Sequence, residues 1–316
     1  MKLFHALLML VGLFSATVST AEVGQPVGRI TLIVTSAPGG VSDAVARVVA
    51  EGLNKKANLT VVVDNKPGNG GEVAASITAR SAPTGNTLFL GSVGPLAMST
   101  VLNKDKIDYS VQSFSAVAMV GITPSVIYSS DPSIKDWPEL YKQYANDPQS
   151  NIIGYSLATG QMIIDQIKGQ TKKQNPSLLF KGSGPLQIAL LNGSIQSGVD
   201  VLYPMANQGP EGKIRPLVVF SEKRSPFFPN IPSITEFLPK FECCVPVFFS
   251  IVVPANTSKE TIEFLNKRIN EVLADPNYVS ILHKQYLETH QMTPSETTSF
   301  INKAVDRVNS IAKTIQ

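Results

Sequence analysis

Short apolar segments alternate with amphipathic helical patterns along the first part of the chain, and only a few residues separate them. Arg29–Ser36 and Leu59–Asp64 are rich in β-branched residues, which predicts two strands. Between them, Asp43–Lys55 has apolar residues at helical spacing, which predicts a helix. Connections this short make each helix pack on the sheet formed by its neighbouring strands, as in a parallel βαβ unit. The alternation therefore predicts an α/β fold.

The alternation continues through the middle of the chain, and from Ser258 onward the pattern is mostly helical. Further strands are predicted at Thr87–Leu90, Ala116–Val120, Ser125–Tyr128, Asn151–Tyr155, Ser177–Phe180 and Val199–Tyr203, and further helices at Glu72–Ser81, Trp137–Ala145, Gln161–Gly169 and Pro185–Asn192. Turn-forming residues gather at Gly121–Pro124 and Glu222–Pro226, where we expect the chain to cross between two lobes. The expected division is 22–121 with 226–316 as the first lobe and 122–225 as the second, each with a mainly parallel sheet flanked by helices.

Residues 1–21 have the layout of a secretory signal peptide. Lys2 gives a positive start, Leu3–Phe14 an apolar stretch, and Ser19–Ala21 a small-residue cleavage site. The apolar stretch is shorter than the roughly 20 residues that a membrane-spanning helix needs. We therefore expect cleavage near Ala21 and export of the remaining chain, with an uncut membrane anchor as the alternative.

Charge and cysteine content narrow the possible functions. Removal of the leader takes away Lys2 and no acidic residue, so the net charge of +3 becomes +2. This excess is too small to indicate a nucleic-acid partner, and the sequence has no dense block of lysine and arginine. The two cysteines, Cys243 and Cys244, are adjacent and cannot connect distant parts of the chain. A vicinal disulfide and a pair of buried thiols are both open.

Sequence signatures of cofactor sites and enzymes are absent. The stretch GNGGEV begins like the dinucleotide pattern G-x-G-x-x-G, but Val73 occupies the last position. The chain has no phosphate-binding P-loop, no H-E-x-x-H zinc motif and no G-x-S-x-G nucleophile turn. His283 and His290 lie seven residues apart in a late helical segment. We therefore expect no cofactor, no metal and no catalytic residue, although a nucleophile assembled from distant residues remains open.

Four loops rich in glycine and hydroxyl-bearing residues follow predicted strands. They are Pro38-Gly39-Gly40-Val41-Ser42-Asp43, Gly91-Ser92-Val93-Gly94, Ser156-Leu157-Ala158-Thr159-Gly160 and Lys181-Gly182-Ser183-Gly184-Pro185. The first turn of a helix has free backbone amides and a positive dipole end, and glycine lets a ligand approach the main chain closely. Lys181 can add positive charge to the same region. These loops predict a site for a small anion, with simple tight turns as the alternative.

The order of several motifs resembles one known family. The motifs are ITLIV followed by GGVSDAVARVVAEGL, then VVVDNKPGNGGEVAA, APTGNTLFLGSVGPLA, KGSGPLQIALLNGSI, KIRPLVVFSEKRSPFFPNIPSITEF and VVPANTSKETIEFLNK. Together they resemble the periplasmic solute-binding receptors of the tripartite tricarboxylate transporter family, also called Bug proteins. The resemblance covers essentially the whole chain after the leader. It implies a two-lobed periplasmic binding protein fold, type II-like, with the ligand cleft between the lobes.

The resemblance also implies a function. Such a receptor is a periplasmic monomer that captures a small carboxylate by hinge closure and delivers it to membrane transporter subunits, without catalysis. The ligand-binding residues implied here are Pro38, Gly39, Gly40, Ser42, Asp43, Ser92, Ser156, Thr159, Gly160, Lys181, Gly182, Ser183 and Asp200. An exported enzyme on the same scaffold, a ligand sensor for a signalling system and an envelope scaffold that binds only protein are the alternatives.

Overall fold

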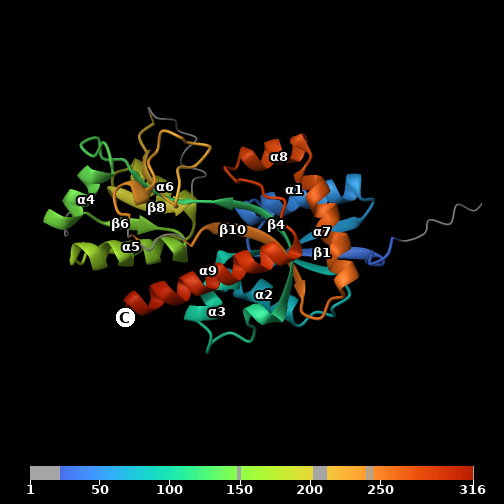
Figure 1. Ribbon diagram of the computed structural model, residues 1–316. Coiled ribbons are helices and arrows are strands. Elements are labelled where there is room, and N and C mark those ends of the chain that lie inside the picture. The colour runs from blue at the N-terminus through green and yellow to red at the C-terminus, as the bar shows by residue number, and fades with distance from the viewer. Residues whose placement is uncertain (1–21, 148–150, 202–211, 240, 242–244, 316) are drawn as a thin grey trace, which may run out of the picture.

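The computed structural model describes residues 22–315 except 148–150, 202–211, 240 and 242–244. Its strands form two five-stranded sheets, ordered β2-β1-β3-β10-β4 and β7-β6-β8-β5-β9. We call the first sheet with its helices the first lobe and the second sheet with its helices the second lobe; Figure 1 shows them side by side. The strands are β1 (Arg29–Val34), β2 (Thr60–Asn65), β3 (Thr87–Ser92), β4 (Phe114–Thr123), β5 (Ser125–Ser129), β6 (Ile153–Tyr155), β7 (Ser177–Leu179), β8 (Ser197–Val201), β9 (Arg215–Phe220) and β10 (Val247–Pro254).

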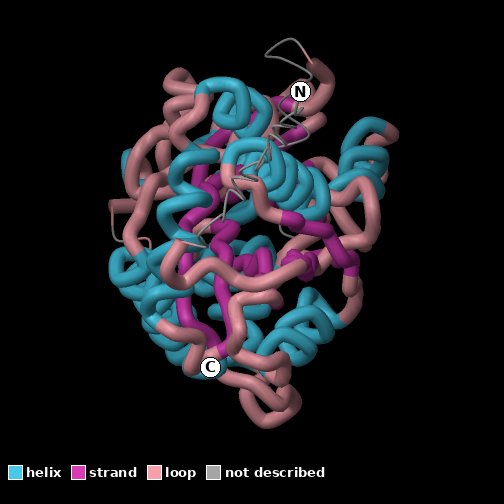
Figure 2. Tube along the Cα trace, turned by 90° about the vertical axis from the view of Figure 1, so that its right-hand side faces the viewer, coloured by secondary structure: helices cyan, strands magenta, loops and turns pink. Residues whose placement is uncertain are grey.

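Helices cover the sheets, and Figure 2, a view along the long axis, shows them arranged around the strands. They are α1 (Val41–Lys56), α2 (Glu72–Ala79), α3 (Ser99–Leu102), α4 (Trp137–Asn146), α5 (Ala158–Thr171), α6 (Ser183–Leu191), α7 (Lys259–Leu273), α8 (Pro276–His283) and α9 (Pro294–Ile315). No helix in the described part of the chain is long and apolar enough to cross a membrane.

The predicted two-lobed α/β fold is confirmed, but both sheets are mixed where we expected mainly parallel ones. β1 runs parallel to β2 and β3, whereas β10 runs antiparallel to β3 and β4. The second sheet repeats this arrangement, with β6 parallel to β7 and β8 and with β5 antiparallel to β8 and β9. β4 leaves the first lobe where β10 enters it, at the pair Thr123 and Val247, so these two strands must run in opposite directions. The same argument applies to β5 and β9.

The chain passes from the first sheet to the second between β4 and β5, where Pro124 is the only connecting residue. It returns between β9 and β10. Ile234 and Phe241 of the returning loop are buried in the core of the second lobe. The lobe boundaries after residues 121 and 225 stay predictions, and this packing favours a return point nearer to β10 than 225.

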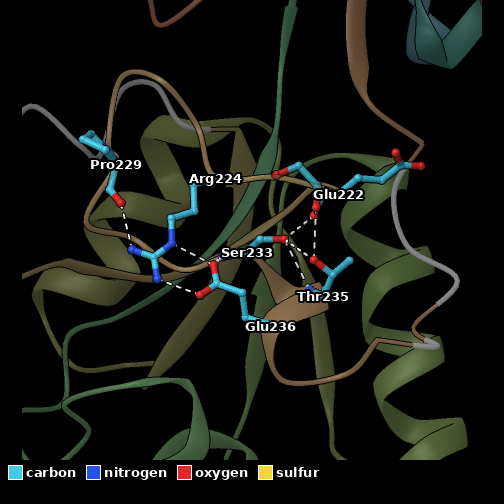
Figure 3. Close-up of polar contacts among 7 residues, drawn as sticks. Glu222, Arg224, Pro229, Ser233, Thr235 and Glu236 are labelled. Atoms are coloured by element: carbon cyan, nitrogen blue, oxygen red, sulfur yellow. Dashed lines mark hydrogen bonds and ion pairs between the residues drawn. The ribbon is translucent and has the colours of Figure 1, made fainter.

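Polar contacts hold the first part of the returning loop in shape, as Figure 3 shows. The Arg224 guanidinium donates through Nε to Glu236 Oε1 at 2.7 Å and through Nη2 to Glu236 Oε2 at 2.6 Å. Its Nη1 donates to the Pro229 carbonyl at 2.9 Å. The Thr235 hydroxyl donates to the Glu222 carbonyl at 3.1 Å, which ties the two ends of the segment together. Residues 222–236 are therefore a fixed part of the second lobe at its junction with the first.

α9 connects the two lobes along one side of the molecule. It packs on β4 in the first lobe and reaches α5 in the second, crossing much of the molecule in Figure 1. Arg307 of α9 lies 3.7 Å from the Glu222 carboxylate of the returning loop. On another side, the ring of Tyr286, just after α8, packs on Phe228 with centroids 5.1 Å apart. The lobes therefore touch at points other than the crossing strands.

Most predicted elements are present within a few residues of their expected bounds. The strand predicted at Val199–Tyr203 is Ser197–Val201, and residues 202 and 203 lie outside the described chain. The predicted signal peptide and the two adjacent cysteines also lie outside it. We did not predict β10, although it is the strand that joins β3 to β4.

Candidate functional site

A cavity of about 560 Å³ lies between the lobes. This volume falls within the range of roughly 300–1,000 Å³ that is typical of small-molecule sites. The first lobe contributes residues of the loops after β1, β2 and β3, and the second lobe contributes residues of the loops after β6 and β7. The cavity therefore lies where both lobes can contact one ligand.

Three helices begin at the wall of this cavity. Their N-cap residues are Gly40 for α1, Leu157 for α5 and Gly182 for α6, and all three line the cavity. None of the three N-cap residues makes a side-chain cap, although in α1 the Ser36 hydroxyl accepts a hydrogen bond from the Asp43 amide at 3.1 Å. Each helix end has the electrostatic effect of roughly half a positive charge. One helix of the first lobe and two of the second therefore create a positive potential in the cavity without a charged side chain.

Asp43 fixes the loop before α1. One of its carboxylate oxygens accepts hydrogen bonds from the Gly39 amide and Arg47 Nε, and the other accepts from Arg47 Nη2 and Asn65 Nδ2, all at 2.9 Å. The bonds from Arg47, together with those from Gly39 and Asn65, lower the pKa of Asp43 to about 2 despite its burial. The carboxylate is therefore ionised and stabilises the loop from behind, outside the cavity lining.

The free amides of this loop are not those of the two glycines. The Gly39 amide donates to the aspartate described above, and the Gly40 amide donates to the Ala37 carbonyl at 3.1 Å. Val41 and Ser42 occupy the first two positions of α1, whose amides have no acceptor within a helix. Both residues line the cavity. Their N–H groups are therefore the donors that α1 can offer to an anion.

Each glycine has a conformational reason to be in this loop. Gly39 has φ +85°, in the left-handed region that other residues rarely adopt. A Cβ atom on Gly40 would lie 2.7 Å from Cβ of Ser36, because the loop turns back on itself. Gly40 lines the cavity, and its predicted contact with the ligand stays a prediction. The glycines therefore shape the turn that presents the next two amides.

Asp200 lies behind the loops of the second lobe. It is on β8, is 2% exposed, and its Oδ1 accepts a hydrogen bond from the Val201 amide at 2.7 Å. Burial raises the pKa of Asp200 to about 6, although the nearby Ser183 and Ser156 hydroxyls and the Val201 amide act in the opposite direction. Those two serines line the cavity, whereas Asp200 does not. A buried carboxyl group therefore lies behind two hydroxyl-bearing residues of the cavity wall.

Two threonines present hydroxyls to the cavity that the rest of the described chain does not satisfy. Thr123 at the end of β4 and Thr159 in the first turn of α5 are each 4% exposed, and both line the cavity. Their Oγ1 atoms have no hydrogen-bond partner among the described residues. A buried hydroxyl without a partner costs about 1–3 kcal/mol, so a ligand that pairs with it gains that energy back.

The structure brings most of the predicted site residues together. Those that line the cavity are Gly39, Gly40, Ser42, Ser92, Ser156, Thr159, Gly182 and Ser183. Those that do not line it are Pro38, Asp43, Gly160, Lys181 and Asp200. Asp43 and Asp200 support the loops as described, the Gly160 amide donates to the Leu157 carbonyl at 2.9 Å, and the Lys181 residue is exposed. Contact with a ligand stays a prediction for the whole set.

Other lining residues were not named individually as ligand-binding residues, although Val41, Val93, Gly94, Leu157 and Ala158 lie in the loops predicted to form the site. These other lining residues are Thr35, Ser36, Val41, Val45, Gly70, Gly71, Val93, Gly94, Met98, Thr123, Leu157, Ala158, Val201, Val247, Phe249, Gln285 and Leu287. The glycine turn GNGGEV and the crossing segment Gly121–Pro124 were visible signals for Gly70, Gly71 and Thr123. Gln285 and Leu287 gave no signal, because they reach the cavity only through the pairing of Glu288 with Ile122 of β4.

The lining has no charged side chain and no histidine among the described residues. His283 packs against the Phe227 ring with centroids 5.3 Å apart, and His290 lies 3.8 Å from the Glu288 carboxylate, so neither is part of the lining. Within the described chain, no group of three or more histidine, cysteine, aspartate or glutamate residues could hold a metal ion. The cavity therefore offers amides, hydroxyls and apolar surface to a ligand.

Two α/β lobes around a shared cavity define a two-lobed solute-binding protein. A solved structure described as a periplasmic transporter superposes with a TM-score of 0.81 at 25% identity, covering 91% of this chain and 97% of that one. The family model described as tripartite tricarboxylate transporter family receptor matches residues 45–316, and the chain belongs to this family. Members of the family are periplasmic binding proteins.

Two relatives make the family assignment more specific. Protein BugT of Bordetella pertussis is 30% identical over 312 residues, which cover 95% of this chain and 94% of BugT. An R. palustris protein solved with adipate has a TM-score of 0.81 and 25% identity, covering 92% of this chain and 98% of that protein. The predicted family and fold are therefore confirmed.

Proposed function

We propose that this protein captures a small carboxylate in the cavity between its lobes and delivers it to the membrane subunits of a tripartite tricarboxylate-type transporter. It does so in the periplasm as a monomer, after removal of the leader near Ala21, and it performs no catalysis. The observation that carries the proposal is the convergence of three helix N-termini, from both lobes, on one cavity. A relative that was solved with a carboxylate, adipate, supports the ligand class.

Main-chain amides and hydroxyls are sufficient for useful affinity. A hydrogen bond to a charged group contributes roughly 1.5–3 kcal/mol. The amides of Val41 and Ser42 together with the hydroxyls of Ser156, Thr159 and Ser183 provide five groups around the cavity. After the costs of association, four or five such bonds are consistent with the roughly 8 kcal/mol of micromolar binding.

Closure follows from the division of these groups between the lobes. α1 belongs to the first lobe, whereas α5 and α6 belong to the second. A carboxylate that contacts all three helix ends makes its full set of hydrogen bonds only when the lobes are close together. The ligand therefore favours the closed state through contacts that the open state lacks.

A ligand screen tests the proposal. Purified protein is screened by thermal shift and calorimetry against mono-, di- and tricarboxylates, with the corresponding uncharged amides as controls. We expect at least one carboxylate to raise Tm and bind at micromolar concentration, and its amide to have no effect. If no carboxylate binds, or if amides bind equally well, the proposal is wrong.

A proline substitution tests the role of the α1 amides directly. Val41→Pro removes one N–H group at the first position of α1, where proline is well tolerated, and Gly40 before it already has the extended ψ of 166° that proline requires. Lys259→Pro makes the same change at the first position of α7, outside this cavity. Loss of a charged hydrogen bond predicts affinity reduced by about tenfold to a hundredfold in Val41→Pro. The control variant should bind normally; equal affinity in both variants contradicts the assignment.

A further inference from the structure

Strand order gives the cavity two ends. In the first sheet, α1 begins after β1, and β3 and β10 lie between β1 and β4. Neighbouring strands are about 4.8 Å apart, so the end of β4 lies roughly 14 Å across the sheet from the end of β1. The second sheet has the same order, because α6 and α5 follow β7 and β6, whereas β5 and β9 lie on the other side. Both lobes therefore have helix N-termini at one end and crossing strands at the other.

The end near the crossing strands is mostly apolar. Val201, Val247, Phe249 and Leu287 line it, and each is at most 8% exposed. Val247 pairs with Thr123 of β4, and Val201 pairs with the first residue of β5, which places these side chains beside the crossing point. A second carboxylate here would lose its hydration among aliphatic and aromatic side chains.

Among the described residues that line this end, none has a charged side chain. The polar groups of the described lining there are the Thr123 hydroxyl and the Gln285 amide, both uncharged. A buried charge without a partner is strongly unfavourable, so this end selects against a charged group of either sign.

The opposite end has positive potential for about one carboxylate. Three helix ends of roughly half a charge each give about one and a half charges. Asp200 lies close behind the second-lobe loops and offsets part of that potential when it is ionised. A ligand with two or three carboxylates would therefore exceed what the cavity can compensate.

We propose that the ligand is a monocarboxylate with an apolar body, whose far end is a methyl group or another uncharged group within reach of Thr123. The inference rests on the proposed function, since it takes the carboxylate at the helix ends as given. It excludes amino acids with a distal ammonium group, dicarboxylates and tricarboxylates as the preferred class of ligand.

A matched series of ligands tests this proposal. Straight-chain acids of six and of eight carbons are compared by calorimetry; in each set the far end of the chain is a methyl, hydroxymethyl, carboxylate or aminomethyl group. For the six-carbon set these are hexanoate, 6-hydroxyhexanoate, adipate and 6-aminohexanoate. We expect the methyl and hydroxyl members to bind at least tenfold more tightly than the two doubly charged members. Tighter binding of the dicarboxylate or of the amino acid overturns the inference, and so does equal binding of all four members.

A charge introduced at the apolar end should change the preference. Gln285→Arg adds a long cationic side chain at a partly exposed lining position, and Gln170→Arg adds the same charge at an exposed position on α5. We expect Gln285→Arg to improve adipate binding relative to hexanoate by about tenfold, as one charged hydrogen bond does, and Gln170→Arg to leave the ratio unchanged. An unchanged ratio in both variants counts against the inference.

The two proposals fail in different ways. If dicarboxylates bind and monocarboxylates do not, the proposed function stands and the inference about the ligand's far end is wrong. If no member of the series binds and the broader carboxylate screen is also negative, the proposed function itself is wrong.

Discussion

Replacement of Asp200 by asparagine should stabilise the protein at neutral pH and have little effect in acid. Burial raises the pKa of this carboxyl from 3.8 to about 6, so its ionised form is unfavourable in the folded state. The difference between these pKa values corresponds to about 3 kcal/mol. Asparagine has nearly the same shape, keeps an oxygen that can accept from the Val201 amide, and never ionises.

The direction of the pH dependence follows from the raised pKa. Between pH 3.8 and 6 the folded protein keeps the proton of Asp200, whereas the unfolded chain loses it. The stability that this group provides is complete below pH 3.8, is lost as the pH rises to about 6, and then stays constant. The unfolding free energy of Asp200→Asn minus that of the unmodified protein should therefore rise by about 2 to 3 kcal/mol from pH 4 to pH 7.5.

Urea unfolding followed by tryptophan fluorescence measures this difference. The single tryptophan, Trp137, is buried in the second lobe, the same lobe as Asp200, so its signal reports the relevant unfolding. Asp105→Asn, at an exposed turn, is the matched control and should show no such pH dependence. A difference that is the same at both pH values, or that falls as the pH rises, refutes the reasoning.

Three further predictions concern the cavity and its supports. Thr123→Val removes an unsatisfied buried hydroxyl, so the unfolding free energy of the ligand-free protein, measured in urea, should rise by about 1 kcal/mol. Binding of 6-hydroxyhexanoate should weaken relative to hexanoate. A loss of stability contradicts this prediction. Gly121→Ala places a Cβ atom 2.5 Å from Cγ of Leu287, so we expect the free energy of unfolding to fall by about 1–3 kcal/mol and ligand binding to weaken. Unchanged Tm and affinity in this variant would contradict the prediction. Asp43→Ala leaves the Gly39 amide without its acceptor and should lower the free energy of unfolding by about 2 kcal/mol at pH 7. This loss should shrink as the pH falls toward 2, because the carboxylate of the unmodified protein is then protonated. A loss that does not depend on pH would contradict the prediction.

Local sequence patterns predicted most of the fold, because most elements have a clear period. Short connections in the βαβ region and proline and glycine at the crossing were sufficient to place two lobes. β10 was missed because its residues, Val247–Pro254, form an apolar run, interrupted only by Ser250, with no strand partner nearby in the sequence. It pairs with β3 and β4, which lie more than a hundred residues earlier, and no local pattern reports such pairing. The same long-range pairing makes the sheets mixed.

The sequence indicated which loops form the candidate site, but not which atoms of those loops are free to contact a ligand. Glycine and serine at helix starts indicated the loops that line the cavity, but not which amides are free. That Gly39 donates to Asp43, and that Val41 and Ser42 therefore carry the free amides, depends on contacts seen only in the folded loop. The raised pKa of Asp200 likewise depends on burial, which its position in the sequence does not reveal.

The C-terminal helix restricts how the lobes can move. Because α9 packs on β4 and also reaches α5, a rotation about the crossing strands slides α5 along its side. The relative motion of the lobes is then closer to a shear motion, in which helices slide along each other, than to an unrestricted hinge rotation. The Arg307–Glu222 ion pair is one contact that this motion must stretch or exchange. Shortening of the helix from its C-terminal end would release this guide and broaden the range of lobe orientations in solution.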